Sequence, residues 1–300
     1  MTETIAVHQL SKRYKEDTVV DELTFELEPN KIYGLVGRNG AGKTTLLRML
    51  AGQLAPSQGS VTVLGEPPYD NNRILTRLCL IKESQQYPSK YRVSDVLNAA
   101  QILYPDWDAG YAADLLREFE LPGKRMVNKL SRGMLSALGI VVGLASRAPV
   151  TLFDEPYLGL DAVARERFYE QLLIDYAEHP RTFVISTHLI DEISRVLEHV
   201  LVIDKGRLLL SSDTEQLRGN ACMVIGPAQA VEKFVVNRRV MNRTPIGGYV
   251  KAVVLDTPPE SVKQEAERLG IEVSPVTLQQ YVIQLTGRSG DGAYGQEVFK

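Results

Sequence analysis

The chain has 300 residues, of which 44% are hydrophobic and 24% are charged, and its formal net charge is -3; these values suit a soluble globular protein with one large and one small domain. The slightly acidic balance argues against the basic face that a nucleic-acid-binding protein needs, so we expect no nucleic acid partner. Two cysteines give no disulfide framework, which indicates a reducing cytoplasm, and no apolar run reaches the roughly 18 residues that span a bilayer.

The N-terminal region begins with alternating apolar and polar residues. The segments AVHQL and LTFEL, within residues 3–28, show this alternation. A period of two residues is typical of strands that bury one face. The sequence therefore predicts an antiparallel β-subdomain at the start of the chain.

A glycine-rich loop follows, between an apolar segment at 32–36 and the helical pattern TTLLRMLAG. The segment GRNGAGKTT fits the phosphate-binding pattern G-x4-G-K-[ST], and a strand before it and a helix after it are the context that this pattern requires. The glycines let the backbone fold closely around a phosphate, and the start of the helix adds partial positive charge. We expect Lys43 to reach the β- and γ-phosphates of a nucleotide and Thr44 to bind Mg²⁺. The expected nucleotide-binding residues of the loop are Gly37, Asn39, Gly40, Ala41, Gly42, Lys43, Thr44 and Thr45.

The middle of the chain changes to a helical pattern from about residue 92 to 146, as in VSDVLNAAQIL and AGYAADLLREFE. The run LSRGM opens the last of these helices. Ser131 stands at the expected N-cap of this helix, and Gly133 permits a close backbone approach.

Two carboxylates end the apolar segment VTLFDEP. Successive strand residues point to opposite sides of a sheet, so Asp154 and Glu155 can do different work. We predict that Asp154 holds the Mg²⁺ shell and that Glu155 orients and deprotonates the attacking water. A further apolar strand, FVISTH, ends at His188. With the apolar segments near 32–36 and 200–204, these strands predict an α/β sheet.

The chain continues past the last strand of this sheet. After about residue 217 the pattern is strand, helix, strand, strand, helix, strand, which is the order of the ferredoxin-like split βαβ arrangement. We therefore expect a nucleotide-binding domain at 1–217, a small α+β domain at 218–287 and a flexible tail at 288–300. The small domain has either a regulatory or dimer-supporting role or only a stabilising one.

The order of these motifs resembles the ATPase subunit of ATP-binding cassette (ABC) transporters. The phosphate loop, LSRGM, DEP, LGLD and STH follow one another as in that family, over about residues 3 to 215. The segments LSRGM and DEPYLGLDAVAR are most similar in sequence to those of bacterial exporter-type cassettes linked to antibiotic or stress response. The resemblance implies an α/β P-loop NTPase core of ABC type with an antiparallel β-subdomain and a helical arm, and it implies ATP and Mg²⁺ as cofactors.

The resemblance also implies where ATP is bound. In the family, two cassettes pack head-to-tail, and each ATP lies between one chain's phosphate loop and the other chain's signature segment. Ser131 and Gly133 would then contact the γ-phosphate of the partner's ATP, whereas His188 would contact the γ-phosphate in its own chain. Asp161, in LGLD, would lie at the dimer interface, and Tyr14, in SKRY, matches the aromatic position that stacks on adenine. The structural alternatives are a half-buried Tyr14 at a strand edge and a core His188 that caps the next helix.

The chain departs from the family pattern within and near the signature segment. The usual signature is LSGGQ, and here Arg132 and Met134 replace a Gly and the Gln. Arg132 then either adds charge near the partner's nucleotide or faces solvent. Tyr157 stands where a small Ser or Thr is common, and the sequence offers no account of it.

A second departure follows the apolar strand in RLCLIKES. Family members usually carry a Gln there, and by register Glu83 takes its place. A carboxylate at this position could still bind Mg²⁺ or water, although it adds negative charge beside a triphosphate. Gln85 and Gln86 are the other candidates for this role.

The full motif set predicts the ATP-hydrolysing motor subunit of a membrane transporter. The chain would form a homo- or heterodimer of cassettes and drive a separate integral-membrane permease, from the cytoplasmic face of the cell membrane. The alternative is a soluble non-transport ABC ATPase. However, the stretch between Lys43 and Asp154 is too short for the long coiled coil of DNA-repair members, and ribosome-acting members usually hold two cassettes. A small-molecule kinase would explain the phosphate loop but not LSRGM, LGLD and STH together.

Overall fold

The computed structural model of the chain describes residues 4–83, 85–219, 221–255 and 257–287. The chain divides into two compact units. The first unit extends to His188 and also contains Ile203–Leu208, and the second comprises Leu189–Val202 and the chain from Leu209 onwards. The tail expected at 288–300 lies outside the described residues.

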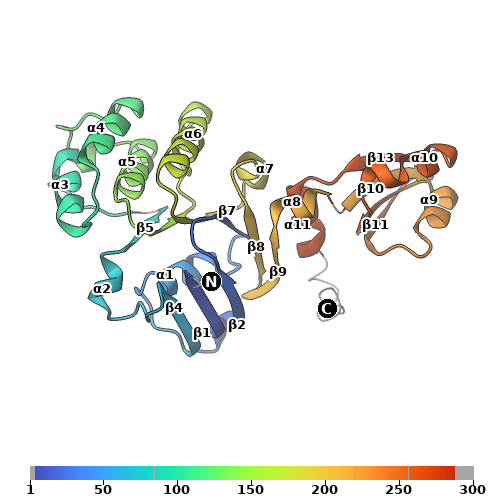
Figure 1. Cartoon of the computed structure of the whole chain (residues 1–300), viewed down its shortest axis with the longest axis horizontal. Coiled ribbons are helices and arrows are strands. Elements are labelled where there is room, and N and C mark those ends of the chain that lie inside the picture. The colour runs from blue at the N-terminus through green and yellow to red at the C-terminus, as the bar shows by residue number, and fades with distance from the viewer. Residues whose placement is uncertain (1–3, 84, 220, 256, 288–300) are drawn as a thin grey trace. The chain divides into compact units, whose positions relative to one another are not determined.

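A three-stranded antiparallel sheet forms one layer of the first unit, drawn in blue in Figure 1. Its strands, in the order β2-β1-β4, are β1 (Ile5–Tyr14), β2 (Asp17–Leu27) and β4 (Gln58–Val63). Ile5, Val7 and Leu10 of β1 are buried, and irregularities in the β1–β2 register after Val7 interrupt the strict alternation. This sheet confirms the antiparallel β-subdomain, and it adds β4, which the pattern in residues 3–28 does not include.

The second sheet of the molecule has six strands in the order β5-β6-β7-β3-β8-β9. They are β3 (Ile32–Val36), β5 (Leu78–Lys82), β6 (Val150–Asp154), β7 (Thr182–Thr187), β8 (His199–Asp204) and β9 (Arg207–Asp213). β5, β6, β7 and β3 pair in parallel. Every residue of β3, β6 and β7 is buried, which explains their continuous apolar runs. Because parallel strands end at one edge, the segments that follow β3, β6 and β7 gather there.

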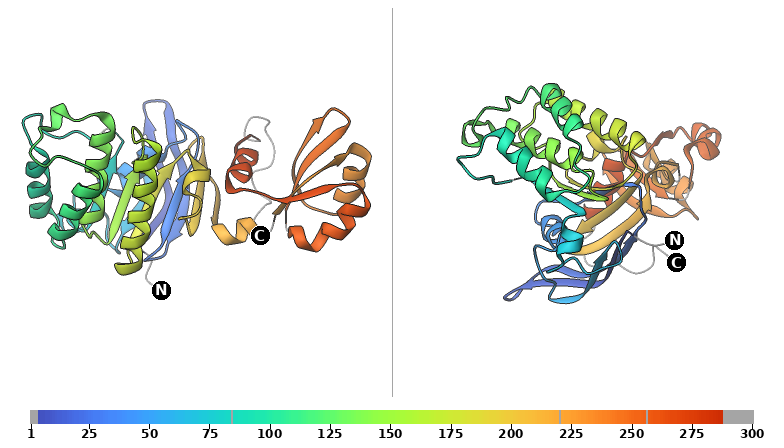
Figure 2. Two further views of the ribbon diagram at one scale, coloured as in Figure 1. Left: turned by 90° about the horizontal axis from the view of Figure 1, so that it is seen from above. Right: turned by 60° about the vertical axis from the view of Figure 1, so that its left-hand side comes forward.

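The helical arm expected at 92–146 is present as three α-helices within that range, which are drawn in teal to green in Figure 2. The helices of the first unit are α1 (Lys43–Leu50), α2 (Asn72–Leu75), α3 (Val93–Leu103), α4 (Ala109–Glu118), the short 3-10 helix η1 (Val127–Lys129), α5 (Arg132–Ala145) and α6 (Ala162–Glu178). α5 is buried throughout its second half, from Ala137 to Ala145. It therefore forms the centre of the arm and positions the signature segment at its own N-terminus.

The second unit contains a four-stranded sheet in the order β11-β12-β10-β13, antiparallel at each pairing. Its elements are α7 (Ile190–Ile193), α8 (Thr214–Gly219), β10 (Ala221–Pro227), α9 (Ala228–Val235), β11 (Val240–Ile246), β12 (Tyr249–Leu255), α10 (Pro259–Arg268), β13 (Glu272–Pro275) and α11 (Leu278–Gly287). The core packs alternate residues of β10 and β12 against α9 and α10, with Val224, Phe234 and Ala266 fully buried. Among the described residues of either unit, no helix is both long and apolar enough to cross a membrane.

Candidate functional site

The glycine-rich loop between β3 and α1 is packed too tightly for side chains at two of its glycines. A Cβ atom on Gly37 would lie 2.3 Å from the carbonyl oxygen of Ile203, and one on Gly42 would lie 2.6 Å from that of Val19. Gly40 and Gly42 have φ angles of 82° and 103°, a region that favours glycine. The loop therefore lies close against β8 and β2, and α1 begins at its end.

Lys43, the first residue of α1, points back into this loop. Its side chain is buried, and Nζ donates a hydrogen bond of 2.7 Å to the carbonyl oxygen of Gly37. The same ammonium lies 3.4 Å from Oε1 of Glu155. One positive charge therefore connects the glycine-rich loop to the carboxylates that follow β6.

The two carboxylates at the end of β6 have different environments. Asp154 is the last residue of the strand, and its Oδ1 accepts a hydrogen bond of 2.6 Å from Oγ of Ser186. Glu155 has left the strand conformation, with φ at 51°, at a cost of about 1–3 kcal/mol for a non-glycine residue. Its backbone N–H donates to the same Ser186 hydroxyl at 3.0 Å. One hydroxyl on β7 thus fixes the turn that separates the two side chains.

The carboxylate of Glu155 is surrounded by partners. Its Oε2 lies 2.5 Å from Nδ1 of His188 and accepts a hydrogen bond of 3.1 Å from the phenol of Tyr157. The side chain of His188 is 36% exposed, so it is not the core histidine of the structural alternative. Burial raises the pKa of Tyr157 well above its ordinary value, so the phenol stays protonated and able to donate.

These groups border one cavity of about 500 Å³. Segments that follow β3, β5, β6 and β7 line it, together with the start of α5. The lining residues are Val19, Asn39, Gly40, Ala41, Gly42, Lys43, Thr44, Thr45, Glu83, Arg132, Glu155, Leu158 and His188. The structure therefore brings together most of the site residues that the sequence predicts.

Some predicted site residues do not border this cavity. Asp154 is buried and Gly37 lies at the base of the loop, and neither belongs to the lining. Tyr14, the last residue of β1, does not line it either. The Tyr14 side chain is 42% exposed, with Nζ of Lys12 located 5.4 Å from its ring centre.

The residues expected to face a partner lie at two helix starts. Ser131 caps α5, as predicted, and its hydroxyl accepts a hydrogen bond of 3.2 Å from the N–H of Met134. Asp161 caps α6 in the same way, with a bond of 2.8 Å. A Cβ on Gly133 would lie 2.5 Å from the carbonyl oxygen of Gly159, so this glycine lets α5 approach the loop before α6.

Arg132 and Glu83, both in the lining of the cavity, form an ion pair. Nη2 of Arg132 lies 2.7 Å from Oε1 of Glu83, and the two side chains are 67% and 43% exposed. From the sequence, Arg132 was expected near the partner's nucleotide or in solvent, and this contact within the chain was missed. Of the three candidates for the Gln position, Glu83 lines the cavity, whereas Gln85 and Gln86 do not.

The donor atoms here fit a magnesium ion that is shared with a nucleotide. Mg²⁺ prefers oxygen ligands and usually takes one or two carboxylates in addition to substrate phosphates. Thr44 and Glu83 offer oxygens at the cavity, and Asp154 ends the neighbouring strand. No group of three or more His, Cys, Asp or Glu that could hold a metal occurs in the described part of the chain, so an all-protein cage is absent there.

A larger cavity, of about 760 Å³, lies at the other edge of the parallel sheet. Asn30, Pro149 and Thr182, next to the amino ends of β3, β6 and β7, contribute to its lining. Its two arginines, Arg147 and Arg181, are already ion-paired with aspartates. The smaller cavity is therefore the better candidate for chemistry.

Known proteins that resemble the chain share both its motifs and its fold. The ABC transporter family model matches residues 20–158. The Nod factor export ATP-binding protein I of Burkholderia thailandensis is 30% identical over 299 residues, which cover 95% of this chain and 97% of the relative. The chain belongs to the ATP-binding subunits of ABC transporters.

Further comparisons agree with this ABC subunit assignment. The bacitracin transport ATP-binding protein BcrA of Bacillus licheniformis is 32% identical over 212 residues, covering 70% of this chain and 69% of the relative. A solved structure of an ATP-binding subunit of an ABC transporter superposes with a TM-score of 0.66 at 26% identity, covering 72% of this chain and 92% of that one. The ABC subunit is thus an ATP-hydrolysing motor of a transporter, with an α/β P-loop core and an antiparallel sheet. The alternative, a soluble non-transport ATPase, is not supported.

Proposed function

We propose that this ABC subunit hydrolyses Mg²⁺-ATP in a site that a second cassette completes, and that the hydrolysis drives an integral-membrane permease. The observation that carries the proposal is the cavity that joins the phosphate loop to Glu155 and His188. Lys43 and Glu155 lie 3.4 Å apart beside it. A cation for phosphates and a carboxylate for water are the two groups that the reaction needs.

We assign one task to each side chain around the bound ATP. When ATP binds, the ammonium of Lys43 leaves the loop carbonyls and Glu155 and contacts the β- and γ-phosphates. Thr44 and Asp154, with Glu83 in support, hold Mg²⁺, which neutralises charge on the phosphates when bound. Glu155 orients the attacking water and takes its proton, and His188 contacts the γ-phosphate.

The start of α5 would serve the ATP of the other cassette. Ser131 and Gly133 lie at the N-terminus of this helix, where the backbone N–H groups and the helix dipole favour a phosphate. Asp161, at the start of α6, would lie at the same dimer interface. The adenine would stack on Tyr14, whose ring is half exposed at the end of β1.

We also propose the domain boundaries and the setting of the chain. The nucleotide-binding domain comprises 1–217, and a ferredoxin-like domain comprises 218–287. The sheet order β11-β12-β10-β13 with two helices on one face supports the ferredoxin-like assignment. This domain would regulate or support the dimer. The relatives named for Nod factor export and bacitracin transport support an exporter-type permease at the inner face of the cell membrane.

The substitution Glu155→Gln tests the proposed base. The variant should bind ATP and form a stable ATP-dependent dimer, whereas kcat should fall by about 10²–10⁴-fold because the water loses its proton acceptor. Steady-state phosphate release measures the rate, and light scattering with and without Mg²⁺-ATP measures the dimer. Unchanged turnover in a normally folded variant would exclude this role for Glu155.

A further inference from the structure

Tyr157 is a large buried side chain that follows the segment 154–156 directly. It is only 1% exposed and belongs to the largest fully buried side chains of the described residues. It follows Glu155 by two positions, in the connection between β6 and α6. The roles proposed above for phosphate, magnesium and water do not use this residue.

The phenol oxygen of Tyr157 meets three groups. It donates to Oε2 of Glu155 at 3.1 Å, shares a hydrogen bond of 2.7 Å with Oγ1 of Thr187, and accepts from the backbone N–H of His188 at 3.2 Å. A phenol has one hydrogen to give and two lone pairs to receive with. If Thr187 donates, the three contacts use this capacity completely, so the geometry assigns the phenol hydrogen to the carboxylate.

The same hydroxyl joins the two segments that must act together. Glu155 belongs to the turn after β6, and His188 follows β7. Their side chains meet at 2.5 Å, and the Tyr157 phenol bonds to the Glu155 carboxylate and to the His188 backbone. Glu155 holds an uncommon backbone conformation, which persists only where surrounding contacts maintain it.

We propose that Tyr157 is a positioning residue for ATP hydrolysis, which aims the Glu155 carboxylate and ties it to His188. The proposal rests on the proposed role of Glu155 as the base. Tyr157 donates one hydrogen bond and takes no proton from the reaction. A residue that acts only through Glu155 should change kcat much more than the KM for ATP.

The substitution Tyr157→Phe removes the hydroxyl and keeps the buried ring. We expect kcat of the full-length chain to fall at least about tenfold, with the KM for ATP within about twofold, because a hydrogen bond to a charged group is lost while Lys43 and the phosphate loop remain. Tyr33→Phe is the matched control, since Tyr33 is also buried and donates its hydroxyl to a carbonyl, that of Glu28. This control should keep kcat within about twofold.

A double-mutant cycle with Glu155→Gln separates positioning from a general structural effect. In the Glu155→Gln background, Tyr157→Phe should have no further effect on kcat, because the group it positions is gone. An equal fall in both backgrounds, or a Tyr157→Phe chain as active as the wild type, would overturn the proposal. If Glu155→Gln alone leaves turnover unchanged, the proposed base is wrong and the positioning role fails with it. If Glu155→Gln slows turnover and Tyr157→Phe does not, only the positioning role fails.

Discussion

At the scale of single residues, the carboxylate of Glu155 is held by three neighbouring side chains. Its carboxylate contacts Lys43, Tyr157 and His188, and its side chain is only 10% exposed. Binding of a triphosphate would draw the ammonium of Lys43 away, leaving two of the three contacts. In the proposed mechanism, the carboxylate that acts as the base is then held by a neutral phenol and an imidazole.

A second feature at this scale is the pairing of two departures from the family pattern. Glu83 is the first of three candidates for the position of the usual Gln, and Arg132 stands at the first Gly of the signature. The structure pairs them at 2.7 Å. Arg132 thereby offsets the negative charge that Glu83 brings to the cavity.

This pairing predicts non-additive effects on ATP affinity. Arg132→Gly alone should weaken Mg²⁺-ATP binding, because Glu83 then faces the triphosphate uncompensated. Adding Glu83→Gln should restore binding in part, because the amide removes this negative charge and still offers an oxygen to Mg²⁺. For an exposed pair the coupling should be about 0.2–1 kcal/mol, which is less than about sixfold in Kd. Isothermal titration of the wild type, both single variants and the double variant measures it. Strictly additive Kd changes would contradict a functional pair.

The sequence predicted the residues of the site better than their contacts. Lys43 and Thr44 lie in a local motif of loop and helix, so their placement beside the cavity followed from spacing alone. Glu83, the partner of Arg132, is 49 residues away in the sequence. Thr187, the partner of Tyr157 on β7, is 30 residues away. Such contacts depend on the packing of α5 and β7, which no local pattern encodes.

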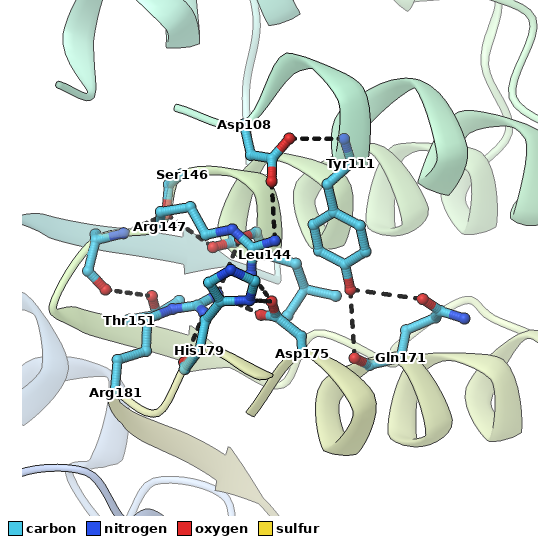
Figure 3. A network of polar contacts seen from close by, with 12 residues as sticks. Asp108, Tyr111, Leu144, Ser146, Arg147, Thr151, Gln171, Asp175, His179 and Arg181 are labelled. Carbon is cyan, nitrogen blue, oxygen red and sulfur yellow. Dashed lines mark hydrogen bonds and ion pairs between the residues drawn. The ribbon is translucent and has the colours of Figure 1, made fainter. Parts of the chain in front are cut away.

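At the scale of elements, one buried aspartate holds several secondary structures together (Figure 3). Asp175 of α6 is fully buried and is ion-paired with Arg147, which follows α5, and with Arg181, which precedes β7, the latter at 2.5 Å. Arg147 also reaches Asp108, the N-cap of α4, at 3.0 Å. This network connects the helical arm to the strand that leads to His188.

Loss of the Asp175 charge should therefore destabilise the chain strongly. Asp175→Asn leaves two nearly buried guanidinium groups without their shared carboxylate, which we expect to cost about 3–5 kcal/mol. The midpoint of thermal unfolding should fall by at least about 6 °C. Asp114→Asn is the control, because Asp114 forms an exposed ion pair with Arg117, and it should change stability by less than about 1 kcal/mol. Equal effects of the two substitutions would refute this account of the network.

Strands that are buried on both faces were predicted correctly, because burial alone determines their sequence pattern. β3, β6 and β7 are buried on both faces and are visible as apolar runs. β4 was missed because its first three residues are exposed and it joins β1 from a distance. Its place depends on sheet pairing, which a local pattern does not reveal.

At the scale of the whole molecule, the chain divides into two compact units. The first unit contains the cavity and the helix starts that would face a partner, and the second has a core of its own. Within it, the order of strands and helices from β10 to β13 was predicted, because each is short and bounded by turn residues. Its role stays a prediction, since the cavity that carries the chemistry lies within the first unit.

The central claim is that each ATP is hydrolysed between two chains, and mixing two inactive variants tests it most directly. Lys43→Ala disables a chain's own phosphate loop. Ser131→Asp keeps an N-cap but sets a negative charge against the partner's γ-phosphate. Each variant alone should be inactive.

An equimolar mixture of the two variants should recover about a quarter of the wild-type ATPase activity, because half of the dimers are mixed and each has one intact site. A chain that carries both substitutions, mixed with the Lys43→Ala variant, is the control and should stay inactive. ATPase activity that fails to rise on mixing, although mixed dimers form, would contradict a site shared between two cassettes.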